Sequence, residues 1–260
     1  MSQTTFHALR VSIAEHIAVV TLDRPPVNAQ TRATQDEIAL CFDELSDRAE
    51  VRVVILTGAG RVFSAGADLK ARVAAVPVPG GDRQHLRSAR ESYHAIMECR
   101  KPVIAAINGP ALGAGLALVA SCDILLAAEE AELGLPEVTV GLMGGSRHAM
   151  RLFGHSTVRR MMFTGARLSG PELYRRGVVE ACVPQAELLP AAHAIAGRIA
   201  ELSPTAVQLA KHAVNTIETM SLRDGYRFEQ DMTLQLGRTP DAMEAKRAFL
   251  EKRKPVFGAG

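Results

Sequence analysis

The sequence predicts an α/β protein in which a layered core with mainly parallel strands is followed by a run of helices. Short apolar stretches alternate with stretches of helical period as far as about residue 135, and this alternation is typical of parallel α/β cores. From Gln185 onward almost every stretch has a helical period. Hydrophobic residues make up 47% of the chain and aromatic residues only 4%, so Ala, Val and Leu must supply most of the buried surface.

The first half of the chain contains most of the predicted strands. Two apolar runs separated by Glu15-His16 predict a hairpin, and Pro25-Pro26 lies beyond its end because proline cannot continue a ladder. The predicted elements, in chain order, are a hairpin over 11–22, a helix over 31–47, a buried strand over 51–56, a short strand at the start of 62–69, a helix over 83–99, a buried strand over 103–107, a helix after the turn at 113–115 and a strand over 123–128.

Residues 70–82 contain two prolines and two glycines without a clear period, and they predict a mobile loop. Beyond Glu137 the predicted elements are short helices over 148–153, 156–163 and 170–176, a strand over 178–183, and longer helices over 188–202, 204–218, 222–236 and 240–252. Pro204 and Pro240 stand in the first turn of their helices, as helix-start rules expect.

These elements predict two parts, a core over 1–185 that carries the active site and a helical oligomerisation region over 186–260. The helices of the second part have apolar faces that one small core need not cover, so we expect an oligomer.

Composition excludes several classes of protein. A net charge of +2 and the absence of Trp argue against a nucleic-acid partner. The longest apolar stretch, residues 111–128, is interrupted by Ser121 and Asp123 and predicts no membrane span. The first ten residues lack the pattern of an export signal, and the four cysteines are widely spaced. We therefore expect a cytoplasmic protein with free thiols and no metal site.

Two loops have the same design, in which a short apolar run leads to small residues and then to a helix. One contains Ala65-Gly66-Ala67 and the other Gly113-Ala114-Gly115. If the two loops are neighbours, the N–H groups of Ala67 and Ala114 can converge on one oxygen that becomes anionic during a reaction. The alternative is that the glycines only allow close packing of helix on strand. Neither loop matches the glycine patterns of dinucleotide-binding or ATP-binding loops.

Three segments resemble the enoyl-CoA hydratase/isomerase (crotonase) superfamily: VFSAGADL at 62–69, INGPALGAGLAL at 107–118 and GLPEVTVGLMGG at 134–145. RPPVNA near the start and AFLEKRKPVF near the end extend the resemblance over nearly the whole chain. It implies a spiral of β-β-α units with a C-terminal helical trimerisation region, assembled as a trimer or a dimer of trimers. It also implies acyl-CoA substrates and no cofactor besides the coenzyme A of the thioester.

The resemblance also assigns roles to residues. The N–H groups of Ala67 and Ala114 would hold the thioester oxygen, and Phe249 and Lys252 would reach the coenzyme A nucleotide of an adjacent subunit. The alternatives are interface packing for Phe249 and a solvated lysine at a helix end for Lys252. Further contacts with coenzyme A are assigned to Val27, Ala29, Ala65, Ala67, Asp68, Leu69, Lys70 and Gly113. Asp68 is also expected to cap a helix or anchor its loop.

Catalytic carboxylates determine the reaction. The resemblance makes Glu137 an acid/base residue, and burial near an apolar pocket would adapt it to neutral pH. Hydratases of the family carry a second glutamate, but this chain has Ala117 at that position. Hydration of an enoyl-CoA is the expected reaction. The alternatives are a double-bond isomerase or another single-carboxylate reaction of the superfamily, and a non-catalytic acyl-CoA-binding protein. His148 could replace the missing group or be a structural histidine, and weaker candidates are Glu91, Tyr93 and Tyr226.

Overall fold

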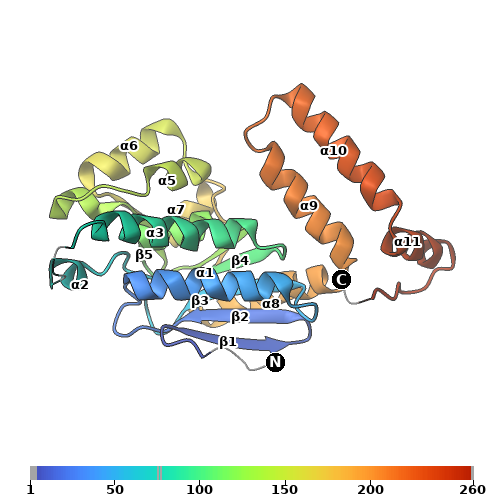
Figure 1. Cartoon of the computed structure of the whole chain (residues 1–260), viewed down its shortest axis with the longest axis horizontal. Helices are drawn as coiled ribbons and strands as arrows, with labels where there is room; N and C mark the ends of the chain where they lie inside the picture. The colour runs from blue at the N-terminus through green and yellow to red at the C-terminus, as the bar shows by residue number, and fades with distance from the viewer. Residues whose placement is uncertain (1–4, 75, 77, 259–260) are drawn as a thin grey trace.

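The computed structural model describes residues 5–74, 76 and 78–258, and its larger sheet forms the centre of the molecule (Figure 1). The strand order is β1-β2-β3-β4-β6-β9, with β1 and β2 antiparallel and each later pair parallel. The strands are β1 (Leu9–Ala14), β2 (Ile17–Leu22), β3 (Val53–Gly58), β4 (Val103–Ile107), β6 (Ile124–Ala128) and β9 (Ala181–Val183). The predicted parallel α/β core is confirmed.

Helices cover both faces of this sheet. On one face lie α1 (Arg32–Asp47) and α3 (Gly81–Glu98), and on the other lies α8 (Gln185–Ala200). Strand β3 is buried on both faces because alternate side chains point to opposite sides. Val54 packs in the cluster beneath α1, and Ile55 packs in the cluster beneath α8. Thr31 caps α1 by accepting a hydrogen bond from the Thr34 N–H.

A smaller sheet contains β5 (Ala111–Leu112), β7 (Glu132–Gly134) and β8 (Arg167–Ser169), in the order β5-β7-β8. Sequence reasoning missed these strands because two or three residues are too few to establish a period. Bridges between Ser64 and Ala111 and between Gln30 and Ala67 continue the pairing beyond β5. The smaller sheet therefore brings together three segments that are distant along the chain.

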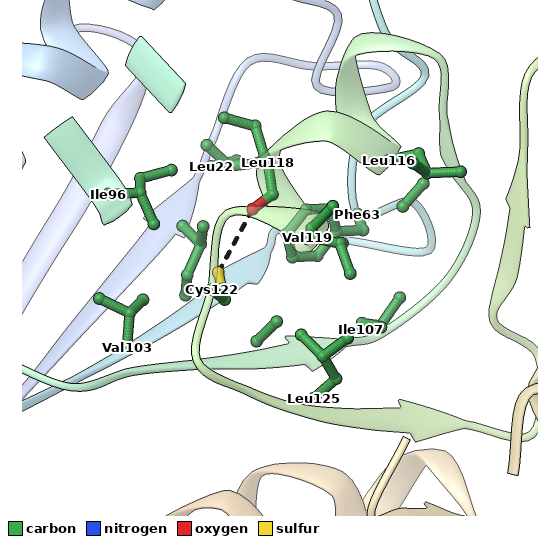
Figure 2. Close-up of a cluster of buried hydrophobic side chains, with 14 of the residues drawn as sticks. Leu22, Phe63, Ile96, Val103, Ile107, Leu116, Leu118, Val119, Cys122 and Leu125 are labelled. Carbon is green, nitrogen blue, oxygen red and sulfur yellow. Dashed lines mark hydrogen bonds between the residues drawn. The ribbon is translucent and has the colours of Figure 1, made fainter. Parts of the chain in front are cut away.

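Helix α4 (Ala114–Ala120) holds the second small-residue loop against the core (Figure 2). Leu116, Leu118 and Val119 are completely buried, and they pack among side chains from β4, α3 and the segment around Phe63. The Cys122 thiol donates to the Leu118 carbonyl at 3.3 Å and closes the end of the helix. Because the body of α4 is fixed by this packing, its first turn is fixed as well.

Two details of the predicted first half are wrong. Residues 62–69 form isolated bridges and not a strand, because their backbone hydrogen bonds are divided between two segments, 27–30 and 110–112. Leu69–Ala74 forms a helical turn, α2, inside the stretch that we predicted as a loop over 70–82. Asp68 starts this helix, since its Oδ1 accepts the Ala71 N–H at 2.9 Å. Residues 75 and 77 of that predicted loop lie outside the described residues.

After β7 the chain forms short helices and then returns to the sheet. They are the 3₁₀ helix η1 (Pro136–Val140), α5 (Ser146–Leu152), α6 (His155–Thr164) and α7 (Gly170–Arg175). The predicted short helices are confirmed to within a few residues, and β9 completes the larger sheet.

The last three helices, α9 (Pro204–Ile217), α10 (Leu222–Gly237) and α11 (Pro240–Leu250), form an arm that projects from the core (Figure 1). Helix α8 belongs almost entirely to the region 186–260 that we predicted as a helical oligomerisation region. It nevertheless packs on the sheet of the core. Lys211 of α9 ties the arm to the core, because its Nζ lies 2.8 Å from Asp123 Oδ2 and donates to the Lys101 carbonyl at 3.0 Å. In the part of the chain that the structure describes, no helix combines the length and apolar character that crossing a membrane requires.

Candidate active site

The two small-residue loops lie in contact. A Cβ added at Gly66 would lie 2.6 Å from the Leu112 carbonyl oxygen and 3.3 Å from the Ala114 nitrogen. The Leu112 N–H donates to the Ser64 carbonyl at 3.0 Å, which sets the register between the loops. Gly115 packs equally closely on Ser64, so a larger residue there would push α4 away. The glycines thus allow close packing and also bring Ala67 next to Ala114.

Buried polar side chains fix the first loop. The Ser64 hydroxyl donates to the Asn28 carbonyl at 2.8 Å and accepts from Gln30 Nε2 at 3.1 Å. Asn28 in turn donates from Nδ2 to the carbonyls of Ala59 and Val62. Sequence reasoning missed these residues because their partners are more than thirty residues away. The RPPVNA segment that contains Asn28 was the available signal.

The N–H groups of Ala67 and Ala114 have no acceptor among the described residues of the protein. Ala114 begins α4, and the first N–H groups of a helix have no partner within that helix. The bridge with Gln30 uses the Gly66 carbonyl and the Asp68 N–H, so it leaves the Ala67 N–H free. Both alanines are half-buried, which leaves this pair of donors open to a ligand.

Glu137 lies against the second loop. Strand β7 pairs Gly134 with Leu112, and η1 then carries Glu137 back to Gly113. A Cβ added at Gly113 would lie 2.5 Å from Glu137 Oε1, so a larger residue there would displace this carboxyl group. Oε2 is buried, and it has no hydrogen-bond partner within the described residues.

Burial raises the pKa of Glu137 above its usual value of 4.5, and a hydrogen bond to its own backbone acts in the opposite direction. A buried carboxyl group whose pKa is raised in this way is a candidate for an acid/base residue. The structure therefore places one such carboxyl group beside two free N–H donors.

Helix α4, whose sequence is AGLALVA over Ala114–Ala120, contributes no carboxylate to the remaining wall of the site. Ala117 is buried in that helix, and the Ser121 hydroxyl donates to its carbonyl at 2.8 Å. Tyr93 of α3 and His148 of α5 are in edge-to-face contact, with ring centroids 4.8 Å apart. Burial raises the pKa of Tyr93, and the nearby Glu137 carboxylate raises it further. Tyr93 and Glu137 therefore face the same region.

Several residues that the resemblance assigns to coenzyme A gather around the first loop. The Ala65 N–H donates to the Val27 carbonyl at 3.0 Å, and Arg24 Nη1 donates to the Ala29 carbonyl at 3.0 Å. Arg24 also forms an ion pair with Asp68, which caps α2 as expected. The backbone N–H of Ala71 and the Arg24 guanidinium lower the pKa of Asp68. The exposed residues of this group are Val27, Ala65, Leu69 and Lys70.

Phe249 and Lys252 lie apart from these residues. Both belong to the end of the arm, on the opposite side of the molecule from α2 (Figure 1). The Phe249 side chain is 82% exposed, so it is available to another subunit and is not packed within its own chain. Of the weaker candidates, Glu91 is paired with Arg90 on the surface and Tyr226 is exposed on α10.

Comparisons with known proteins identify the family to which the chain belongs. The model of the family described as enoyl-CoA hydratase/isomerase matches residues 12–260. A probable mitochondrial enoyl-CoA hydratase of Dictyostelium discoideum is 36% identical over 245 residues, which is 93% of this chain and 87% of that protein. A probable enoyl-CoA hydratase of Bacillus subtilis is 34% identical over 263 residues, which is 96% of this chain and 98% of that protein.

Among solved structures, an enoyl-CoA hydratase from Bacillus anthracis superposes with a TM-score of 0.91. It is 35% identical in sequence, and the match covers 98% of this chain and 100% of that chain. The chain therefore belongs to the enoyl-CoA hydratase/isomerase family and is an enzyme of that type. The expected crotonase fold is confirmed.

Proposed function

We propose that this enzyme adds water to the double bond of an enoyl-CoA thioester, or removes it in reverse, through a thioester enolate. The observation that carries the proposal is the contact of Glu137 with Gly113, beside the free N–H groups of Ala67 and Ala114. An enolate needs stabilisation of its oxygen and a group that moves the proton at C2, and this site supplies both.

The two N–H groups form the proposed oxyanion hole. Addition to the double bond, or removal of the C2 proton, moves negative charge onto the thioester oxygen. Loss of one donor of this kind typically raises a barrier by about 3 kcal/mol. The donors belong to loops that buried side chains hold in place, so little reorganisation is needed when the charge develops.

Glu137 is the proposed acid/base group. Burial raises its pKa, so this carboxyl group holds a proton more readily than an exposed glutamate does. The C2 atom of a thioester whose oxygen occupies the hole would lie within reach of this carboxyl group, because the Glu137 side chain contacts the residue next to Ala114.

The rest of the coenzyme A site is proposed on the same basis. Val27, Ala29 and the residues from Ala65 to Lys70 would line the path of the pantetheine chain. Exposed apolar side chains on the arm, among them Leu222, Phe249 and Leu250, support an oligomer in which Phe249 and Lys252 contact the nucleotide bound to a neighbour. A trimer or a dimer of trimers is the assembly that we propose.

Two more general properties follow from the proposed chemistry. The proposed chemistry relies on backbone donors and on side chains that transfer protons, so we propose that the enzyme uses no cofactor besides the coenzyme A of its substrate. All four cysteines are unpaired, which supports a reducing compartment, and we propose the cytoplasm.

A double-bond isomerase is the second candidate, and Ala117 favours it. A positioned acid or base typically contributes about 10²- to 10⁴-fold to a rate, so a hydratase without its second carboxylate needs a substitute. A shift of a double bond needs only one group that removes a proton at one carbon and returns it at another. Glu137 is suited to that role.

A panel of enoyl-CoA esters, analysed by mass spectrometry, distinguishes the two reactions. A hydratase increases the product mass by one water, whereas an isomerase leaves the mass unchanged and moves the double bond. Glu137→Gln should reduce turnover by about 10²-fold or more and leave acyl-CoA affinity nearly unchanged. Glu130→Gln, at an exposed position, is the matched control. Acyl-CoA binding without turnover of any ester would instead identify a non-catalytic binding protein.

A further inference from the structure

Helices α4 and α5 run side by side in the same direction, which sets the height of each residue on the shared wall. At their starts, a Cβ added at Gly145 would lie 3.6 Å from the Gly113 carbonyl oxygen. At their ends, Arg151 Nη1 donates to the Ala120 carbonyl at 2.6 Å. The two contacts fix the register of α5 against α4.

This register places the turn of α5 that contains His148 and Ala149 at the height of Ala117. His148 precedes Arg151 by three residues, and residues three apart lie on the same face of a helix. Arg151 reaches α4, so His148 is on the face of α5 that is turned toward α4. Ala117 likewise precedes Ala120 by three residues. The imidazole is therefore on the neighbouring helix at the height where hydratases of the family carry the second carboxylate.

Tyr93 connects His148 to the proposed acid/base group. The two rings meet at an interplanar angle of 68°. A Cβ added at Gly145, which immediately precedes α5, would lie 4.0 Å from Glu137 Oε1, so the carboxyl group is at the start of the helix that carries His148. The Glu137 carboxylate also raises the pKa of the Tyr93 hydroxyl. Histidine, tyrosine and glutamate thus surround one region from α5, α3 and η1.

The polar atoms of this pair are available to a substrate. Within the described residues, neither His148 nor the Tyr93 hydroxyl makes a hydrogen bond, and neither is among the fully buried unpartnered groups. A structural histidine is normally held by hydrogen bonds through its ring nitrogens. His148 is held instead by packing, which leaves its nitrogens free.

The charges around His148 favour its neutral form. Burial lowers its pKa most, and the nearby cations of Arg151, His94 and Arg147 lower it further. Glu137 is the acidic group on the other side of Tyr93. Arg151 is itself engaged, since it also forms an ion pair with Glu218 of α9. A neutral imidazole can accept a proton from water at physiological pH.

We propose that His148, positioned by the ring of Tyr93, is the second proton-transfer group of the reaction and takes the place of the carboxylate absent at Ala117. The proposal rests on the hydratase function proposed above. Hydration starts with Glu137 protonated and His148 neutral. The water oxygen bonds to C3 while a proton of that water passes to His148. The C2=C3 electron pair moves into the thioester and forms an enolate, whose oxygen is held by the N–H groups of Ala67 and Ala114.

Collapse of the enolate then takes the Glu137 proton at C2. The imidazolium of His148 returns one proton to Glu137 through solvent, which restores both groups to their starting forms. Tyr93 is a positioning residue in this scheme, because its ring, and not its hydroxyl group, holds the imidazole.

The test compares two reactions, hydration and exchange of the C2 proton. The exchange reaction requires Glu137 and the oxyanion hole, but it does not require His148. Crotonyl-CoA is the probe for hydration, and butyryl-CoA in D₂O is the probe for exchange. His148→Gln should slow hydration by about 10²-fold and change exchange by less than about three-fold. His155→Gln, at an exposed position on α6, is the matched control and should change neither rate.

Two further readouts distinguish a proton-transfer role from a structural one. The acid limb of kcat/KM for hydration should report protonation of His148 and disappear in His148→Gln. Tyr93→Phe should keep most of the hydration activity, whereas Tyr93→Ala should lose it. An unchanged hydration rate in His148→Gln, or an equal loss of hydration and exchange, would overturn the proposal. Retention of exchange in Glu137→Gln would instead contradict the proposed function itself.

Discussion

The two sides of the site are constructed in different ways. On one side, backbone N–H groups form the proposed oxyanion hole, and buried side chains together with close glycine contacts hold their loops. On the other side, the proposed acid/base groups are side chains, and the chain has Ala117 where the resemblance implies a second glutamate in hydratases. Backbone donors do not depend on residue identity provided that the glycines are kept. The stabilisation of an enolate can therefore persist while the side chains that determine the reaction change.

Gly66→Ala should break the backbone side and have the largest effect. Its φ is +92°, and the added Cβ would lie 2.6 Å from the Leu112 carbonyl oxygen, so the loops must separate. We expect a loss of about 10²-fold in kcat/KM and a destabilisation of about 1–3 kcal/mol, measured by substrate kinetics and by urea unfolding. Gly60→Ala has a similar φ of +72° and no atom within 4 Å, so it should affect stability only. Equal kinetic losses in both variants would contradict the role of the loop contact.

Gly113→Ala should act where the two sides meet. The added Cβ would lie 2.5 Å from Glu137 Oε1 and would displace the carboxyl group, while the Ala114 N–H stays on α4. We expect C2 exchange to fall by about 10-fold or more, because an acid/base group must be accurately placed. Gly177→Ala, with a φ of +69° and open space, is the control for backbone strain. If exchange is retained in Gly113→Ala, the present position of Glu137 is not required.

Glu137→Gln should increase stability although it removes activity. Burial favours the protonated form, so the folded protein binds this proton more tightly than the unfolded chain does. The ionised group therefore costs stability above its folded-state pKa, and the cost disappears as the pH falls below 4.5. Urea unfolding should show the variant to be more stable than the wild type at pH 7, with a difference that vanishes toward pH 4. A less stable variant at pH 7 would contradict the desolvation of this carboxyl group.

Asp68→Asn should have the smallest effect and the opposite dependence on pH. The Ala71 N–H and Arg24 lower the pKa of Asp68 from its usual value of 3.8. The ionised carboxylate therefore stabilises the fold above pH 3.8, and this stabilisation is lost as the pH falls through the folded-state pKa. We expect a loss of about 0.5 kcal/mol at neutral pH, since an amide oxygen can still cap α2 while the partly exposed ion pair is lost. Thermal unfolding at pH 7 and at pH 3 measures the difference. A larger loss at pH 3 would contradict this assignment.

Local sequence signals predicted much of the fold and half of the site. The hairpin at Glu15-His16 and helix α1 were predictable because their periods and end signals are local. The loop pair was predictable from its repeated design, and Glu137 from its motif. The contact between Tyr93 and His148 was not, because it depends on the register of α5 against α4 and on the packing of α3. The strands β5, β7 and β8 were missed because each is too short to show a period.

The central claim is that Glu137 and the two N–H groups form and quench a thioester enolate. Exchange of the C2 protons of butyryl-CoA in D₂O, followed by mass spectrometry, tests it without requiring knowledge of the natural acyl group. The wild-type enzyme should incorporate deuterium at C2, and Glu137→Gln should reduce the rate by about 10²-fold or more. Exchange at the wild-type rate in Glu137→Gln, or its absence in the wild type, would contradict the account.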